Sequence, residues 1–310
     1  MRVRTRAVAT GFVVLVLIVA IGTIVALRQA GEGLRLPLAG RACTVQADGE
    51  VTLDSQQMAN AATIAAIGVQ REMPERAVVV ALATAYQESG LRNLTGGDRD
   101  SVGLFQQRPS QGWGTPKQIR DPRYAAGKFY AALKKVRGWE DMRVTDAAQK
   151  VQRSAFPEAY EKWADESQVL TRALLGHAST AVTCAVGGDP VMRGAAAIAA
   201  LTEGLTLDWG LRAFTGDDDR QVGRSYFTSA VDSSGNPTLL KVGINESPSA
   251  EGVRAGWRYT HWLVSHAKEH GVKRVTYDGR EWTAKRGDWK RLPDSDRGDT
   301  EVLAEVHADV

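Results

Sequence analysis

Glu88 is the residue whose type and position in this sequence could most directly do chemistry. One residue separates it from a largely apolar run, Val78–Tyr86, and a Ser-Gly pair follows it directly. A carboxyl group among apolar side chains, at the negative end of a helix dipole, is disfavoured in its charged form. A carboxylic acid that keeps its proton near neutral pH can protonate the leaving oxygen of a glycosidic bond. Composition alone also allows an exposed glutamate at a frayed helix end.

A second segment, fifteen residues after Glu88-Ser89-Gly90, favours the chemical interpretation. It reads Gly103-Leu104-Phe105-Gln106-Gln107 and continues to Pro109-Ser110. The pair of segments resembles the soluble lytic transglycosylase and goose-type lysozyme superfamily, and most closely the lysozyme-like domains of exported wall hydrolases from actinobacteria and their phages. Asp121–Tyr124 and Gln152–Pro157 are further matches. The resemblance covers about residues 50–180, and its motifs are specific in combination and weak singly.

This resemblance implies a role for each matching residue. Glu88 would be the general acid, and in a transglycosylase it would then act as the base. Gln106, at the position of the family's cleft glutamine, would hydrogen-bond the acetamido sugars. Further candidates for substrate contacts are Ser89, Gln107, Tyr124 and Tyr160. Ordinary helix packing is the competing explanation for the two tyrosines.

The sequence leaves the reaction type open between transglycosylation and hydrolysis. In a transglycosylase the 6-hydroxyl of muramic acid attacks the anomeric carbon, whereas an inverting lysozyme needs a second carboxylate to activate water. Asp98 and Asp100 could serve as that second carboxylate, although solvated aspartates in a Gly-rich loop explain them equally simply. One departure concerns Gln152–Ala155, which stands where many family members carry Tyr-Asn-Ala-Gly. The departure weakens the resemblance for the part of the substrate cleft that this segment would form.

Helix signals dominate residues 43–185 and predict a mainly α, lysozyme-like domain. Asp54 can cap one helix, a second runs from Pro74 to Glu88, and Asp121-Pro122 has the cap-then-proline pattern of a third. Further helices are expected from Thr145 and Pro157. No alternating strand pattern of useful length appears in this part.

Gly187–Pro190 interrupts the pattern, so residues 186–192 are expected to form a linker to an α+β domain at 193–310. Helices are expected near residues 195–205 and 251–270. Strands are expected at 272–277, at 281–283 after an Asp-Gly turn, and at 302–310. This half weakly resembles a hedgehog or D-Ala-D-Ala carboxypeptidase type domain, and we expect a wall-binding or spacing module.

The metal site of that second resemblance is degenerate in this sequence. Asp232 and His307 match two zinc ligands, but Ser225 stands where the first histidine is expected. The three other histidines of this half are expected on a solvated helix face, namely His261, His266 and His270. We therefore predict no metal and no cofactor.

The N-terminus predicts a membrane anchor. Three arginines precede the uncharged run from Ala7 to Leu27, which is about 30 Å long as a helix. A cleaved signal peptide is the alternative, although such peptides have a shorter apolar stretch. Residues 1–27 are thus expected to hold the chain in the membrane with the N-terminus in the cytoplasm, and residues 28–42 to form a tether.

The two cysteines and the charge balance complete this picture. Cys43 and Cys184 bracket the first domain, and in an exported chain we expect a disulfide between them rather than two free thiols. With 39 basic and 36 acidic residues the chain carries no basic field for nucleic acid. The expected partners are peptidoglycan glycan strands and, through the N-terminal helix, the membrane. The rival functions are a non-catalytic wall-binding protein and a peptidase in the C-terminal half.

Overall fold

The computed structural model describes residues 42–214, 225–231, 237–244, 249–293 and 301–309. No helix within these residues is long and apolar enough to cross a membrane. The expected membrane helix therefore has no counterpart in the described structure, and the run from Ala7 to Leu27 on which it rested lies outside those residues.

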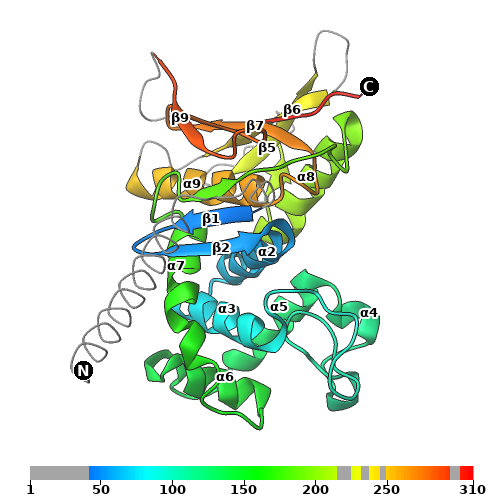
Figure 1. The fold of residues 1–310 in the computed structure, drawn as a ribbon, viewed down its shortest axis with the longest axis vertical. Helices are drawn as coiled ribbons and strands as arrows, with labels where there is room; N and C mark the ends of the chain where they lie inside the picture. Colours follow the sequence, from blue (N-terminus) through cyan, green and yellow to red (C-terminus); the bar gives the residue numbers. More distant parts are fainter. Residues whose placement is uncertain (1–41, 215–224, 232–236, 245–248, 294–300, 310) are drawn as a thin grey trace, which may run out of the picture. The chain divides into compact units, whose positions relative to one another are not determined.

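The first part of the chain contains a small sheet in addition to the expected helices (Figure 1). Its helices are α2 (Ser55–Gln70), α3 (Glu75–Ser89), α4 (Pro116–Ile119), α5 (Pro122–Leu133), α6 (Val144–Gln152) and α7 (Ala164–Leu174). Its strands are β1 (Ala42–Gln46), β2 (Glu50–Asp54) and β3 (Val182–Cys184), and three short 3-10 turns are η2 (Pro109–Gln111), η3 (Trp139–Asp141) and η4 (Glu161–Trp163).

Helices α2 and α3 form the centre of this part because both are apolar on nearly every side. Asp54 caps α2 as predicted, and its carboxylate accepts hydrogen bonds from two backbone amides of the first turn. Gly68 lets the helices approach, since a Cβ there would lie 2.8 Å from Val78 and 2.9 Å from the hydroxyl of Tyr130. Helix α3 is buried from Ala77 to Tyr86 and ends at its glycine cap.

The three-stranded sheet shows that a mainly α first domain was a wrong prediction. Strand β1 lies between β2 and β3, antiparallel to both. Side chains alternate along β1, with Cys43 and Val45 buried, and along β2, with Val51 and Leu53 buried. The strands are only three to five residues long, so their alternation is too brief to stand out beside the helices.

The predicted disulfide is confirmed. Cys43 and Cys184 are register partners on β1 and β3, and their sulfurs are bonded. The bond therefore joins the first strand of the described chain to the strand that leads into the linker.

A seven-stranded sheet dominates the second part of the chain. Only three strands were expected there. Its order is β4-β5-β6-β10-β7-β8-β9, and all pairs except β4–β5 are antiparallel. The strands are β4 (Arg212–Ala213), β5 (Tyr226–Val231), β6 (Pro237–Gly243), β7 (Val272–Tyr277), β8 (Arg280–Thr283), β9 (Trp289–Arg291) and β10 (Glu301–Val306). Strands β7, β8 and β10 match the predicted ranges closely.

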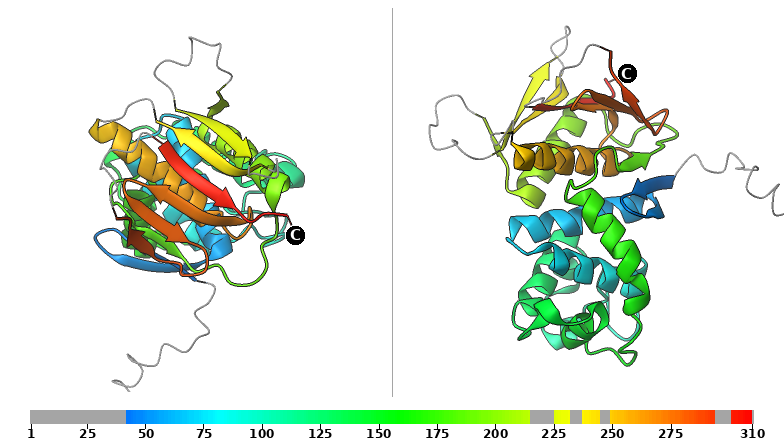
Figure 2. Two further views of the ribbon diagram at one scale, coloured as in Figure 1. Left: turned by 90° about the horizontal axis from the view of Figure 1, so that it is seen from above. Right: turned by 90° about the vertical axis from the view of Figure 1, so that its left-hand side faces the viewer.

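Two helices, α8 (Gly194–Trp209) and α9 (Ala250–Ser265), lie between this sheet and α2 (Figures 1 and 2). Helix α9 is buried on most sides because it contacts β7 and β10 on one side and α2 and α7 on the other. Trp262, in the last turn of α9, is fully buried and packs over Gly204 of α8, where a Cβ would lie 2.5 Å from the indole.

Candidate active site

Glu88 lies on the last turn of α3, where the helix leaves the core. The preceding residue of the buried run, Tyr86, is 8% exposed, whereas Glu88 is half-buried. The helix then stops because Gly90 adopts a left-handed conformation with φ +61°, and its amide donates to the carbonyl of Tyr86. The carboxyl group is thus held by a rigid element and still reaches the surface.

Tyr160 contacts the carboxyl group of Glu88 directly. Its ring is fully buried, and its hydroxyl donates a hydrogen bond to Glu88 Oε1 at 2.7 Å. Burial first, and then the negative charge of Glu88, raise the pKa of the Tyr160 hydroxyl, so Tyr160 keeps its proton and remains a donor. The bond fixes the orientation of one carboxyl oxygen, and no described residue makes a hydrogen bond to the other, Oε2.

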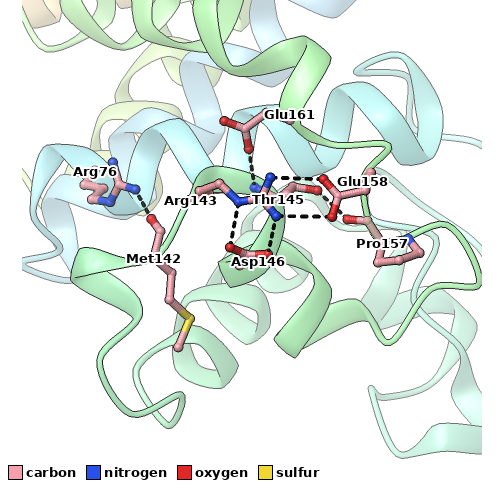
Figure 3. A network of polar contacts seen from close by, with 8 residues as sticks. All are labelled: Arg76, Met142, Arg143, Thr145, Asp146, Pro157, Glu158 and Glu161. Atoms are coloured by element: carbon pink, nitrogen blue, oxygen red, sulfur yellow. Dashed lines mark hydrogen bonds and ion pairs between the residues drawn. The ribbon is translucent and has the colours of Figure 1, made fainter.

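A network of polar contacts anchors the segment that carries Tyr160 (Figure 3). Thr145, at the start of α6, donates through its backbone amide to Glu161 at 2.9 Å and through its hydroxyl to the carbonyl of Pro157. Both ends of the segment 157–161 are therefore tied to one helix terminus. Tyr160 lies within this segment, so its position depends on α6.

Arg143 strengthens the same anchor from outside. Its guanidinium binds Asp146 through two nitrogens at 2.9 Å each and Glu158 through two at 3.1 Å each (Figure 3). Hydrogen bonds from Arg143 lower the pKa of Asp146, so this carboxyl stays ionised. Because all three side chains are substantially exposed, solvent screens the pairs, and their main effect is geometric.

Ser89 joins the two sequence motifs. Its hydroxyl oxygen lies 2.7 Å from the carbonyl oxygen of Leu104 and 3.0 Å from that of Ala85. Gln152, the last residue of α6, donates to the carbonyl of Phe105 at 2.8 Å. The segment Gly103–Gln107 is therefore attached both to the end of α3 and to the end of α6.

The two glutamines of this segment differ in their surroundings. Gln106 is half-buried and has a left-handed backbone, φ +45°. Its side-chain oxygen accepts from Ser101 at 3.0 Å, and its nitrogen donates to the carbonyl of Gly103 at 3.1 Å. Gly97 makes room for this arrangement, because a Cβ there would overlap the amide. Gln106 thus has one amide hydrogen left for a ligand.

Gln107 and Tyr124 have structural partners of their own. Gln107 is 2% exposed and donates to the carbonyl of Ala125 at 3.2 Å, so it belongs to the core. Tyr124 is half-buried, and its hydroxyl donates to the carbonyl of Trp113 at 3.1 Å. Both contacts hold loops against α5.

Asp98 and Asp100 are the candidates for a second carboxylate. The contacts that the structure describes for them are with residues other than Glu88. The side chain of Asp98 is 91% exposed and lies 3.9 Å from Arg99. Asp100 accepts from Arg108 Nε at 2.8 Å and from the amide of Ser110 at 2.8 Å. The hydrogen bond from Arg108, followed by those from Ser110, holds the pKa of Asp100 well below its usual range. Asp100 is therefore ionised, and its hydrogen bonds hold the loop in its conformation.

Sequence reasoning missed two contacts around this site. Trp163 stacks on Tyr86 with ring centroids 4.8 Å apart, and its indole donates to Gln87 at 3.0 Å, which supports the last turn of α3 from outside. The bond from Gln152 to Phe105 was also missed, since Gln152 belongs to the segment that departs from the family pattern. An apolar-polar pattern cannot reveal either contact, because both join residues far apart in the chain.

The histidines of α9 and the turn after it do not form the solvated face that was expected. His261 and His266 are 0% and 4% exposed, and His270 is half-buried. Burial lowers the pKa of each to about 4, which keeps all three neutral at pH 7. The prediction failed because α9 lies between a sheet and other helices, and a sequence alone does not reveal burial on two sides.

The degenerate zinc match is only partly within the described structure. Asp232 lies outside the described residues. His307 follows β10, and Ser225 precedes β5. Among the residues that the structure describes, no three histidine, cysteine or acidic side chains gather closely enough to hold a metal ion.

Searches of protein-family models and of curated proteins give no match to this chain. The lysozyme-like resemblance therefore stays a prediction that rests on the quoted motifs, and the site is interpreted through its geometry.

Proposed function

We propose that this chain is an exported enzyme that cleaves the β-1,4 bond between N-acetylmuramic acid and N-acetylglucosamine in peptidoglycan, with Glu88 as general acid. The observation that carries the proposal is the bond from Tyr160 to Glu88, at the half-buried end of a helix whose remainder is core. Export is supported by the Cys43–Cys184 disulfide, because disulfides occur mainly in oxidising compartments.

Transglycosylation is the reaction that the surroundings of Glu88 favour. Glu88 donates its proton to the glycosidic oxygen as the bond to the anomeric carbon breaks. The 6-hydroxyl of the same muramic acid then attacks that carbon and passes its proton to the Glu88 carboxylate, which restores the acid and leaves a 1,6-anhydro end. This route needs no second carboxylate, and one of the two candidates, Asp100, is already engaged by Arg108 and Ser110.

Digestion of purified peptidoglycan by the full-length chain tests the proposal. Glu88→Gln keeps the size of the side chain and removes the acid, so we expect muropeptide release to fall by about 10²–10⁴-fold. Glu140→Gln makes the same chemical change at an exposed glutamate of the same part of the chain and should leave the rate unchanged.

Mass spectrometry of the released fragments identifies the reaction. Anhydromuramyl ends are expected, whereas reducing ends would mean hydrolysis and would overturn the choice of transglycosylation. If the unmodified chain binds peptidoglycan without releasing fragments, the protein is a wall-binding module and the enzymatic proposal fails.

A further inference from the structure

A large cavity in the second part of the chain is not used by the proposed reaction. It has a volume of about 1030 Å³ and lies between the linker Val186–Pro190, strand β7, the turn after β8 and the end of β10. Val186, Ala267, Val272 and Ala284 give it apolar walls. Cavities of a few hundred to about a thousand Å³ with a few polar groups are typical of small-ligand sites.

Positive charge dominates the lining of this cavity. Four cations line it, Lys273, Arg274, Lys285 and Arg286, against a single carboxylate among the described lining residues, Glu305. His307 also lines the cavity, and burial lowers its pKa, so it adds no charge at neutral pH. The lining residues therefore carry a positive surplus, part of which Glu281 and Asp288 offset from outside the lining through Arg274 and Arg286.

A β-bulge brings two of these cations to the same place. Consecutive residues of a strand normally point to opposite faces. Here Glu305 pairs with Arg274 and Val306 pairs with Val272, which leaves Lys273 as an extra residue opposite β10. As a result, Lys273 and Arg274 both bind Glu305, at 2.7 Å and 2.8 Å. Burial alone would raise the pKa of Glu305, but these two cations lower it, so the carboxylate stays charged and holds both in position.

The other two cations lie on the turn after β8, which packs closely against the linker. Val186 donates its amide to the carbonyl of Ala284 at 2.9 Å. Gly287 approaches Ala185 so closely that a Cβ would lie 2.7 Å from its Cα. Between these two fixed points lie Lys285 and Arg286.

The partners of this second pair leave charge available at the cavity. Arg286 is also 3.1 Å from Asp288 and 3.7 Å from Glu281, neither of which lines the cavity. Lys285 is exposed and makes no ion pair with a described residue. Its charge is therefore the least compensated of the four.

We propose that this cavity is a binding site for a phosphate group carried by a larger molecule. A phosphate monoester brings a charge of about −1.5 to −2 near pH 7 and three acceptor oxygens, so it can bind several of these cations at once. Arginine forks and lysine ammonium groups are the usual protein partners of phosphate. The apolar walls and the volume leave room for the rest of the ligand, either a small phosphorylated molecule or a segment of a polymer that carries several phosphate groups.

Calorimetric titration of the full-length chain tests this site. The probes are inorganic phosphate, glycerol 3-phosphate and polyphosphate, with poly-L-glutamate as the carboxylate counterpart. We expect a saturable signal with a phosphate probe that weakens as NaCl rises from about 50 to about 200 mM. Tighter binding of glycerol 3-phosphate would identify a small ligand, and tighter binding of polyphosphate a polymer, and both support the proposal.

A double variant and a matched control locate the binding. Lys285→Gln with Arg286→Gln should weaken it about tenfold or more. Lys290→Gln with Arg291→Gln removes the same charge from exposed positions on the neighbouring strand β9 and should weaken it less than about twofold. Equal losses in both double variants, no binding of any phosphate probe, or equally tight binding of poly-L-glutamate would overturn the proposal. Thermal unfolding of both variants verifies that they fold.

Discussion

At the scale of single residues, the candidate site depends on one hydrogen bond between a buried phenol and a half-buried acid. Tyr160 is inaccessible to solvent, yet its hydroxyl lies 2.7 Å from Glu88. A buried hydroxyl needs a partner, and here that partner is the proposed catalytic group. Tyr160 is thus a positioning residue whose loss should act on the reaction through Glu88.

Tyr160→Phe keeps the ring and removes the bond. We expect muropeptide release to fall about tenfold through kcat, with little change in KM, and the free energy of unfolding to fall by about 1 kcal/mol. Tyr130→Phe is the matched control, because its buried hydroxyl donates to the carbonyl of Ile64 at 2.9 Å, within the core of α2 and α5. That variant should lose similar stability and keep full activity. Equal activity in both would show that the Tyr160 hydroxyl has no role in the reaction.

At the scale of elements, the sequence predicts the helices around the site better than the sheets. Caps and prolines are local signals, and the helices that begin after Asp54 and Asp121 have the predicted starts. Strand pairing is not local: β3 joins β1 from far along the chain, and β5 and β6 were not predicted at all. The contact of Ser89 with Leu104 was not predicted, because no local pattern encodes it.

The burial of His261 on α9 is another feature that no local sequence pattern predicts. It also makes the stability of the protein depend on pH. His261 bridges two elements: Nδ1 lies 2.8 Å from the carbonyl of Ala173, and Nε2 accepts from the amide of Ala181 at 3.1 Å. Burial lowers its pKa to about 4, below the value of 6.5 in an unfolded chain. The stability that this neutral form gives is complete above about pH 6.5 and is lost as the pH falls toward 4.

Urea unfolding at pH 7 and pH 5 measures this effect. We expect the free energy of unfolding to fall by about 1–2 kcal/mol per buried histidine between these pH values. His261→Gln keeps a donor and an acceptor but cannot take up a proton, so its stability should change less with pH than that of the unmodified chain. An unchanged pH dependence in this variant would mean that His261 does not contribute to it.

At the scale of the whole described unit, a buried carboxylate connects its two parts. Asp208 of α8 has no exposed surface and accepts from Trp262 of α9 at 2.8 Å, from Thr63 of α2 at 3.2 Å, and from Arg123 of α5. Burial raises the pKa of Asp208 in spite of these donors, so the cluster fixes geometry more than it adds stability. Helices α2 and α5 of the first part are thereby held against α8 and α9, which support the large sheet.

The disulfide lies within the first part, between β1 and β3, and its removal gives the last prediction. It closes a loop with a sequence separation of 141 residues, for which chain entropy gives a stabilisation of up to about 4–5 kcal/mol. Cys184 also precedes Ala185 and Val186, which fix the turn at the phosphate-binding cavity. Cys43→Ala with Cys184→Ala should therefore lower the free energy of unfolding by several kcal/mol and weaken phosphate binding, while a reducing agent should destabilise only the unmodified chain. If the variant keeps both properties, the bond neither stabilises the fold nor holds the cavity wall.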